Sequence, residues 1–377
     1  MERFFNTAGP NQPNMAYTLD PLSRFDLDEV LTLIRQAKYF VLHAPRQTGK
    51  TSCMLALRDY LNERGDYIAV YANVEGGQAS RNDVQSVVKG TVDVIVTEAS
   101  DIIGEGIAEP IRDSVLGESM NTMLSAFLSK FSKALSKPLV LFIDEIDSLV
   151  GDSLVSVLRQ LRAGYARRPA AFPQSIVLCG VRDVRDYRIV LSNQDIVTGG
   201  SAFNIKATSL RLNNFTLDEI RTLYGQHTAE TGQVFEEECF PLVWEATEGQ
   251  PWLVNALAHE VTYEMKENRD RSVPINAEMM YRAQERIIYR RDTHIDILND
   301  KLREPRVRRV IEPILAGNDE ADDSLIPTDD VQYTADMGLI KIERGQTRRI
   351  ACGIYREIIT RELTWTTQNV LKQQPQW

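Results

Sequence analysis

The sequence predicts an α/β protein with a parallel sheet flanked by helices, followed by a helical domain and a winged-helix-like C-terminal domain. Two observations indicate this fold class. Apolar runs typical of strands alternate with helix-like segments up to Asn214, an order that favours a parallel sheet with helices on both faces. Beyond Thr216 the pattern is helical until residues 339–351, where two short strand-like runs surround a Gly-containing turn.

The strands of the predicted sheet are short and mostly apolar. A polar lead-in rich in Pro and Asn precedes them, and a helix opens near Asp26. The run 139–143 is apolar at every position, which indicates a strand buried on both faces. Helices are predicted across 80–135, with a break near Gly104, and across 153–166. The predicted strands are 39–43, 67–74, 137–144, 175–181 and 207–212.

The second half of the chain is predicted to be largely helical. Thr216 and Glu219 have the spacing of a capping box, which marks a helix start. The predicted helices cover 217–231, 236–247, 251–267 and 275–300. Strands return at 339–343 and 348–351, which together with the helices before them gives the order of a winged helix. The predicted domains are an extended lead-in (1–25), a sheet core (26–214), a helical domain (215–300) and a winged-helix-like domain (301–377).

The segment from Ala44 to Thr51 carries the most specific motif of the chain. It lies between a predicted strand and a predicted helix and fits the phosphate-binding pattern G-x-x-x-x-G-K-[ST], with Ala44 in place of the first Gly. In such a loop backbone N–H groups bind phosphate, Lys50 reaches the β- and γ-phosphates, and the Thr51 hydroxyl ligates Mg²⁺. Arg46 either contacts a phosphate or lies on the surface. The predicted nucleotide-binding residues here are Ala44, Pro45, Arg46, Gln47, Thr48, Gly49, Lys50, Thr51 and Ser52.

A second motif follows at the end of the apolar strand 137–144. Carboxylates at the carboxyl end of a parallel strand lie where α/β sheets bind ligands. Asp144 is expected to hold the Mg²⁺ shell, and Glu145 to orient and deprotonate a water for attack on the γ-phosphate. Asp147 is expected to face solvent or to cap the next helix. The two motifs together predict an ATPase with ATP and Mg²⁺ as cofactors.

With these motifs the chain resembles the additional-strand P-loop ATPases, that is, the AAA+ proteins and their signalling relatives, the STAND ATPases. Gly249-Gln250-Pro251 looks like the Gly-x-Pro motif of their lid, and the winged-helix-like tail fits as well. The string from His43 to Thr51 is also similar to a bacterial family of AAA-like ATP-binding proteins. The resemblance covers roughly residues 20–365.

The resemblance implies roles that the motifs alone do not give. It implies that the strand ending in Asp144 lies beside the P-loop strand, which takes a central place in the sheet. It implies that Arg182, at the sensor-1 position, reads the γ-phosphate, that residues 215–300 form the lid, and that Pro251 packs on the nucleotide base. The sequence departs from STAND proteins in that no repeat domain or nuclease signature follows the tail.

Several arginines have two interpretations each. Arg162, Arg167 and Arg168, or else Arg185 and Arg188, could supply an arginine finger to a neighbouring subunit, but a solvated basic face is the simpler interpretation. Arg282, Arg286 and Arg290 share one helix face and could contact nucleic acid or a subunit. Interspersed acids such as Glu285 favour a salt-bridged helix face instead.

Composition limits the class of protein. The net charge of −10 and pI near 5.1 argue against a surface that coats nucleic acid, although a local basic patch remains possible. No apolar run reaches the roughly 20 residues that cross a bilayer, and the N-terminus lacks the apolar core of a signal peptide. The four cysteines are far apart and are expected to be reduced, so we expect a cytoplasmic protein without membrane contact.

The predicted function is an ATP-binding and ATP-hydrolysing switch in which nucleotide state controls the lid and the winged-helix-like domain. A protein partner or self-assembly is expected to receive the signal. Two alternatives stay open: a nucleotide-binding signalling or scaffold module with negligible turnover, and a DNA-associated AAA+ loader.

Overall fold

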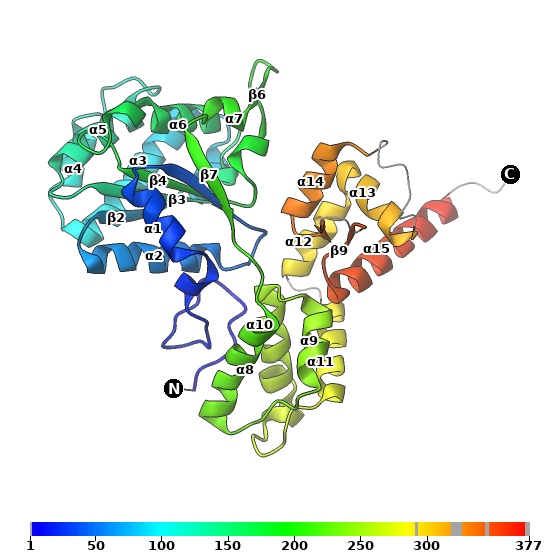
Figure 1. Cartoon of the computed structure of the whole chain (residues 1–377). Helices are drawn as coiled ribbons and strands as arrows, with labels where there is room; N and C mark the ends of the chain where they lie inside the picture. The colour runs from blue at the N-terminus through cyan, green and yellow to red at the C-terminus, as the bar shows by residue number, and fades with distance from the viewer. Residues whose placement is uncertain (1, 291–292, 318–325, 344–346, 374–377) are drawn as a thin grey trace. The chain divides into compact units, whose positions relative to one another are not determined.

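The computed structural model describes residues 2–290, 293–317, 326–343 and 347–373 (Figure 1). The chain divides into two compact units. The sheet unit consists of Asp20–Ala44 and Lys50–Leu212. The helical unit contains the N-terminal residues up to Leu19, the loop Pro45–Gly49 and the chain from Asn213 onward. No helix in the described ranges is long and apolar enough to span a membrane.

A parallel sheet of five strands forms the centre of the sheet unit, as the sequence predicts. Each pair of neighbouring strands in it is parallel. The strands are β1 (Tyr39–His43), β2 (Ile68–Asn73), β3 (Leu139–Asp144), β4 (Ser175–Gly180) and β7 (Lys206–Arg211).

The order of the strands is β2-β3-β4-β1-β7, so the expectation that β3 lies beside the P-loop strand β1 is wrong. β4 lies between them: Val177 is in register with Phe40 of β1 on one side and with Phe142 of β3 on the other. β1 is also flanked by β7. This order brings the end of β4, where Arg182 follows, between the ends of the two strands that carry the nucleotide motifs.

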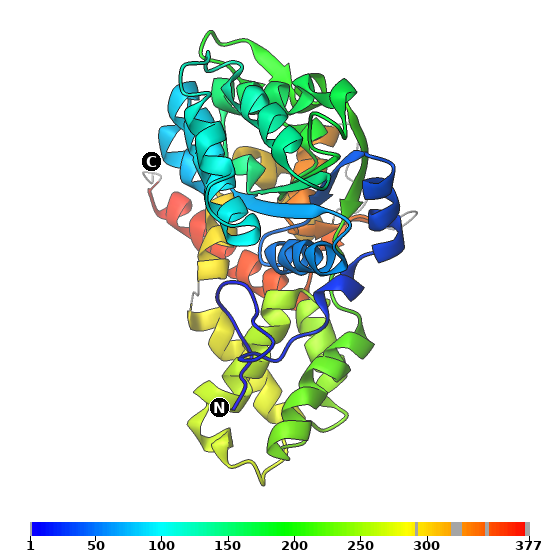
Figure 2. The same cartoon turned by 90° about the vertical axis from the view of Figure 1, so that its left-hand side faces the viewer.

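Helices cover both faces of the sheet (Figures 1 and 2). Alternate residues of β1 point to opposite faces, as the pleat of a strand requires. Phe40 packs in a hydrophobic cluster with residues of α1 and α2, whereas Val41 packs in a second cluster with residues of α3, α5 and α6. The helices are α1 (Leu27–Arg35), α2 (Lys50–Arg64), α3 (Val84–Ile103), α4 (Ala108–Asp113), α5 (Met123–Ala134), α6 (Gly151–Ala163) and α7 (Gly199–Ala202).

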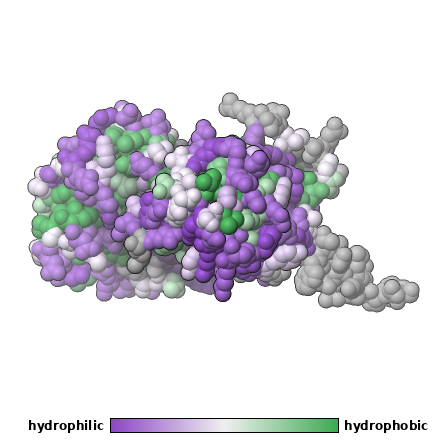
Figure 3. All heavy atoms as spheres, turned by 90° about the horizontal axis from the view of Figure 1, so that it is seen from below, coloured by the Kyte–Doolittle hydropathy of each residue, from purple (hydrophilic) through white to green (hydrophobic). Residues whose placement is uncertain are grey.

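A small antiparallel hairpin, which the sequence did not predict, follows β4. It pairs β5 (Arg188–Val190) with β6 (Ile196–Thr198). Val190 and Ile196 are both exposed on it. The face of the molecule in Figure 3 is mostly hydrophilic, with hydrophobic patches scattered over it.

The helical unit begins after Asn213 with a series of helices. The predicted capping box is confirmed: the Thr216 hydroxyl accepts from the Glu219 N–H, and the Glu219 carboxylate accepts from the Thr216 N–H. A π-helical turn, Glu260–Glu264, directly follows α10. The helices are α8 (Leu217–Thr231), α9 (Cys239–Thr247), α10 (Pro251–His259) and α11 (Ala277–Arg290).

The C-terminal region combines helices with the predicted small hairpin. Strands β8 (Ile340–Lys341) and β9 (Arg349–Ile350) pair antiparallel, while Gly345 of the predicted turn lies outside the described residues. One hydrophobic cluster contains buried residues both of α8–α11 and of this region, and the predicted boundary at 300/301 stays a prediction. The helices are α12 (Thr293–Leu302), α13 (Pro305–Leu315), α14 (Thr328–Asp336) and α15 (Gly353–Gln373).

The predicted extended lead-in, residues 1–25, belongs to the helical unit up to Leu19, and its last residues include a 3-10 helix, Pro21–Arg24, in the sheet unit. Its residues form a single isolated bridge between Phe4 and Ala16. Phe5 and Tyr17 are buried in the hydrophobic cluster of this unit, and the Trp252 indole N–H donates to the Thr7 carbonyl at 2.8 Å. In Figure 2 the segment, drawn in dark blue, crosses the green and yellow helices of the same unit.

Candidate functional site

The predicted phosphate-binding loop connects β1 to α2, which begins at Lys50. Gln47 (φ 58°) and Gly49 (φ 88°) both have left-handed backbone conformations, which bend the chain sharply before the helix. The Thr48 hydroxyl donates to the Pro45 carbonyl at 2.8 Å. The Lys50 ammonium is largely buried and donates to the Ala44 carbonyl at 3.0 Å. The Lys50 ammonium therefore lies beside the N-terminus of α2. Positive charge and free backbone N–H groups at a helix N-terminus favour the binding of an anion.

Thr51 and Asp144, the predicted metal ligands, are brought together although they come from different elements. The Thr51 hydroxyl, on the first turn of α2, donates to Asp144 Oδ2 at 2.8 Å. Asp144 ends β3 and is fully buried, and its Oδ1 accepts from the Glu145 N–H at 2.9 Å. A hydroxyl and a carboxylate are hard oxygen donors of the kind that Mg²⁺ uses together with substrate phosphates. The residues present therefore fit a Mg²⁺ site.

Tyr71 is a third member of this cluster that sequence reasoning missed. It lies near the end of β2, is buried, and its hydroxyl donates to the same Asp144 Oδ2 at 2.8 Å. Burial, and then the nearby Asp144 carboxylate, raise the pKa of the Tyr71 hydroxyl. The phenol thus stays protonated and remains a donor to the carboxylate.

Glu145, the predicted base, has an unusual backbone. Its φ of 57° and ψ of 38° lie in the left-handed region, which is uncommon for a residue other than glycine. Its side chain is half-buried at the end of β3. Strained conformations of this kind gather at functional sites, where the surrounding structure holds a side chain in a required direction.

Asp147 does not face solvent or cap a helix, and that expectation is wrong. Its Oδ2 accepts from the Val181 N–H at 3.3 Å, so the carboxylate lies against the end of β4. Its Oδ1 is buried and has no hydrogen-bond partner in the part of the chain that the structure describes. A methyl group on Gly180 would lie 3.0 Å from this oxygen, so the backbone of β4 approaches it closely.

Arg182 lies two residues beyond the end of β4, half-buried. Its carbonyl accepts from the Tyr187 hydroxyl at 3.2 Å. The neighbouring Asp183 is buried and accepts from the Ser209 hydroxyl at 2.5 Å, which ties this turn to β7. The strand order therefore puts Arg182 at the same edge of the sheet as Lys50 and Asp144.

Of the candidate arginine fingers, Arg162 is exposed near the end of α6, whereas Arg167 and Arg168 have local partners. Arg167 donates to the Ser129 hydroxyl, and Arg168 lies over the Tyr165 ring at 3.3 Å. The side chains of Arg185 and Arg188 lie outside the described set.

On α11, Arg282 pairs with Glu267 at 2.6 Å, and both Arg286 and Arg290 pair with the buried Glu260. The arginine face of α11 is therefore salt-bridged, as the simpler interpretation predicts. The carboxylates of these three pairs, however, belong to Glu260 and Glu267, which precede α11.

Pro251, the predicted base-contacting residue, is buried at the first position of α10 in the helical unit. The Gln250 side chain caps the helix by accepting from the Leu253 N–H at 2.6 Å. Gly249 has a φ of 72°, and a Cβ there would lie 1.9 Å from the Phe215 carbonyl oxygen, so the position requires glycine. The contact of Pro251 with a nucleotide stays a prediction.

Residues 40–172 match the family model "ATPase family associated with various cellular activities (AAA)". This stretch is similar to an AAA-type P-loop ATPase domain. It begins in β1 and includes the phosphate-binding loop, Tyr71, Asp144 and Glu145. No curated protein matches the sequence.

Solved structures resemble the chain in fold. The Walker-type ATPase paby2304 of Pyrococcus abyssi has a TM-score of 0.60 at 16% identity, covering 94% of this chain and 99% of its own. Cdc6p from Pyrobaculum aerophilum has a TM-score of 0.47 at 15% identity, covering 90% and 92%. The Holliday junction branch migration motor RuvB of Thermotoga maritima has a TM-score of 0.40 at 12% identity, covering 93% and 96%. At these identities the likeness concerns the fold alone.

Proposed function

We propose that this protein is a molecular switch of the AAA+/STAND type that binds ATP with Mg²⁺ and hydrolyses it. The observation that carries the proposal is the bond between Thr51 and Asp144, because it joins the two predicted metal ligands at one point beside the phosphate-binding loop. The AAA-type match over residues 40–172, which include Thr51 and Asp144, supports the ATPase part of the proposal.

Each residue of the site has a proposed task. The backbone N–H groups of residues 44–52 bind phosphate at the N-terminus of α2, and Lys50 leaves the Ala44 carbonyl to bind the β- and γ-phosphates. Thr51 and, through water, Asp144 would hold Mg²⁺, which would supply positive charge that offsets the charge of the phosphates. Glu145 takes the proton of the attacking water, and Arg182 neutralises charge that develops on the γ-phosphate.

The switch would act through the helical unit. We infer that 26–214 is the ATPase core, 215–300 the lid and 301–377 a winged-helix-like domain, and that Pro251 packs on the nucleotide base. The state of the nucleotide would change the position of the lid and of the C-terminal domain, a hinge-type transition that a partner or a second copy detects.

Binding and turnover of ATP in four proteins test the proposal: wild type, Lys50→Ala, Glu145→Gln and the control Glu75→Gln. Glu75 is exposed and follows β2 at the same edge of the sheet. We expect Lys50→Ala to lose ATP binding in calorimetry. Glu145→Gln should bind ATP normally while turnover falls by about 10²-fold or more, and Glu75→Gln should resemble wild type. ATP binding by Lys50→Ala equal to wild type would refute the assignment of the loop.

The same series separates the two other functions. A signalling or scaffold module would bind ATP through Lys50 but show negligible turnover already in the wild type. A DNA-associated loader would bind duplex DNA with an affinity that falls steeply between two salt concentrations. The net charge of −10 disfavours that loader.

A further inference from the structure

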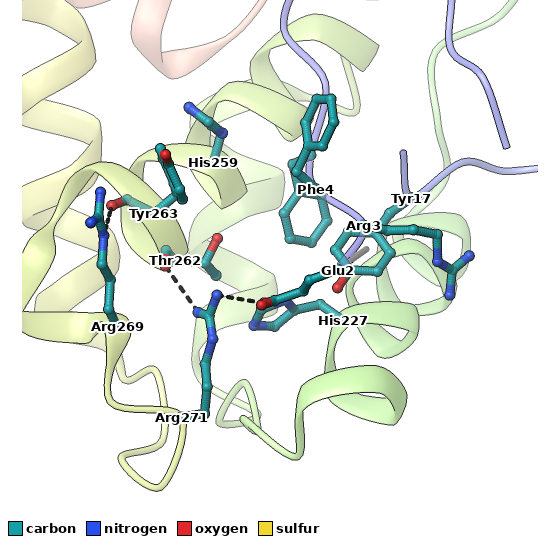
Figure 4. Close-up of a pocket in the computed structure, with 11 residues that line it drawn as sticks. Glu2, Arg3, Phe4, Tyr17, His227, His259, Thr262, Tyr263, Arg269 and Arg271 are labelled. Carbon is teal, nitrogen blue, oxygen red and sulfur yellow. Dashed lines mark hydrogen bonds and ion pairs between the residues drawn. The ribbon is translucent and has the colours of Figure 1, made fainter. Parts of the chain in front are cut away.

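A cavity of about 610 Å³ lies within the helical unit (Figure 4). The N-terminal segment from Glu2 to Phe5 forms one wall, and the π-helical turn with Thr262 and Tyr263 forms another. Its volume is in the range of small-molecule sites, and short π-helical segments occur frequently at functional sites. None of the residues assigned above to ATP binding lines it.

Aromatic rings stand on both sides of this N-terminal cavity. Phe4 is 40% exposed and Tyr263 is 50% exposed. Figure 4 shows Phe4 on the side of the N-terminal segment and Tyr263 on the side of the π-helical turn. The Tyr263 ring is stacked on His259, with centroids 5.2 Å apart, and the Arg269 guanidinium lies over it at 4.4 Å, so the exposed ring that a flat ligand can contact is that of Phe4.

The charge of the lining is positive although the chain as a whole is acidic. Arg3, Arg269 and Arg271 contribute to it, against the carboxylate of Glu2; Arg3 also pairs with Glu230 at 2.8 Å, so the excess of charge comes from Arg269 and Arg271. Arg271 is fixed from behind, since its Nη1 donates to Gln233 Oε1 and to the Thr262 carbonyl, both at 2.9 Å. Its Nη2 donates to Glu2 Oε1 at 2.8 Å. The Arg271 guanidinium is thus held in place, and the Glu2 carboxylate occupies its side that faces the cavity.

The Glu2 carboxylate is weakly held in this position. Its side chain is 54% exposed, and exposed ion pairs contribute little because solvent screens them. An incoming carboxylate or phosphate could therefore replace it on Arg271 at small cost, and bidentate recognition of such anions is what a fixed guanidinium does best.

Two polar atoms of the lining residues lack partners. Tyr17 Oη and His259 Nδ1 are buried and have no hydrogen bond within the described ranges of the chain. Tyr17 as a whole has 0% exposure. A buried polar atom without a partner is costly and rare in native structures, and a bound ligand is one way to satisfy it.

We propose that the N-terminal cavity binds a small anion with a flat ring. The carboxylate or phosphate group binds Arg271 in exchange for Glu2, and the ring lies against Phe4. Tyr17 Oη and His259 Nδ1 bond to polar atoms of the ring. The site does not depend on the proposed ATPase activity.

Calorimetric titration with two probes tests the proposal and separates the sources of the anion. Indole-3-acetate supplies a ring with a carboxylate, and AMP supplies a ring with a phosphate; AMP is titrated into Lys50→Ala so that the phosphate-binding loop does not contribute. Binding of either probe, with one site per chain, is expected. Whichever probe binds identifies the anionic group, and absence of binding of both at millimolar concentration overturns the proposal.

Three variants and one control make the test specific. Glu2→Gln removes the internal competitor, so binding should tighten by about 1.5- to 5-fold, the equivalent of an exposed ion pair. Arg271→Gln should weaken binding by about tenfold or more, and Phe4→Ala should also weaken it. The control Arg303→Gln removes an exposed arginine that does not line the cavity and should bind as wild type. If Arg271→Gln fails to fold, Glu2→Gln and Phe4→Ala still decide; wild-type affinity in both would refute the exchange.

Discussion

Substitution of Tyr71 by Phe removes one hydroxyl from the buried cluster around Asp144 and changes little else. The Tyr71 hydroxyl donates at 2.8 Å to a carboxylate that has 0% exposure, so no solvent compensates for its loss. Hydrogen bonds to charged groups contribute about 1.5–3 kcal/mol to stability. For a unit of this size that corresponds to a drop of roughly 3–12 °C in melting temperature.

The matched control is Tyr67→Phe, which removes a hydroxyl next to the start of the same strand. Tyr67 accepts a longer, 3.3 Å bond from the neutral Gln174 amide, and its ring is only partly buried. We expect Tyr67→Phe to cost about 1 kcal/mol or less. Both variants are compared with wild type by thermal unfolding followed by circular dichroism, at neutral pH and without nucleotide.

The same comparison with Mg²⁺ and ATP adds a second measurement. If Asp144 orients the Mg²⁺ shell, Tyr71→Phe should also raise the Mg²⁺ concentration needed for half-maximal turnover, because the carboxylate loses one of the donors that fix it. Equal melting temperatures for Tyr71→Phe and Tyr67→Phe would refute the reasoning about the cluster.

Three further predictions follow from individual residues. Arg182→Ala should weaken ATP binding more than ADP binding, by about 1.5–3 kcal/mol; an unchanged ratio of the two affinities in calorimetry would mean that Arg182 only stabilises the strand end. Gly249→Ala should destabilise the helical unit by about 2 kcal/mol or more in a denaturant titration, because the new Cβ meets the Phe215 carbonyl. The control Gly225→Ala places its Cβ in open space within α8 and should stabilise the unit slightly in the same titration. Burial lowers the pKa of His227, so at mildly acidic pH the folded unit binds fewer protons than the unfolded chain. The free energy of unfolding at neutral pH should therefore fall as the pH drops below about 6.5. The unfolding midpoints at pH 7.5 and 5.5 should differ less in His227→Gln than in wild type.

Local patterns were enough to predict the elements that carry the nucleotide motifs. The loop before Lys50 and the apolar strand before Asp144 are contiguous signals, because a P-loop needs a strand, a tight turn and a helix in direct succession. The capping box at Thr216 is likewise complete within four residues and appears in the structure as expected. The parallel sheet, the helical region and the small C-terminal hairpin are confirmed for the same reason.

Features that depend on distant pairs were missed or wrong. Tyr71 and Asp144 are 73 residues apart, and a tyrosine in a buried strand looks like an ordinary core residue. The place of β4 between β1 and β3 has no local signal, since each of these strands is apolar and would pair with either neighbour. Phe5 and Tyr17 lie in a polar segment, and only their contacts with the helical unit show that the lead-in belongs to a core.

The position of β1 in the sheet also determines when the nucleotide site is completed during synthesis. Phe40 of β1 is in register with Val177 of β4 and Thr208 of β7, so neither of its neighbours exists until most of the sheet unit has left the ribosome. At ~5–20 residues per second the apolar strand waits on the order of ten seconds without a partner. β2 and β3 are neighbours in the sheet and are both synthesised before β4, so we expect them to pair before β1 is inserted. We therefore expect nascent chains arrested before residue 175 to bind chaperones and to lack nucleotide affinity, which pull-down of stalled ribosomes would measure.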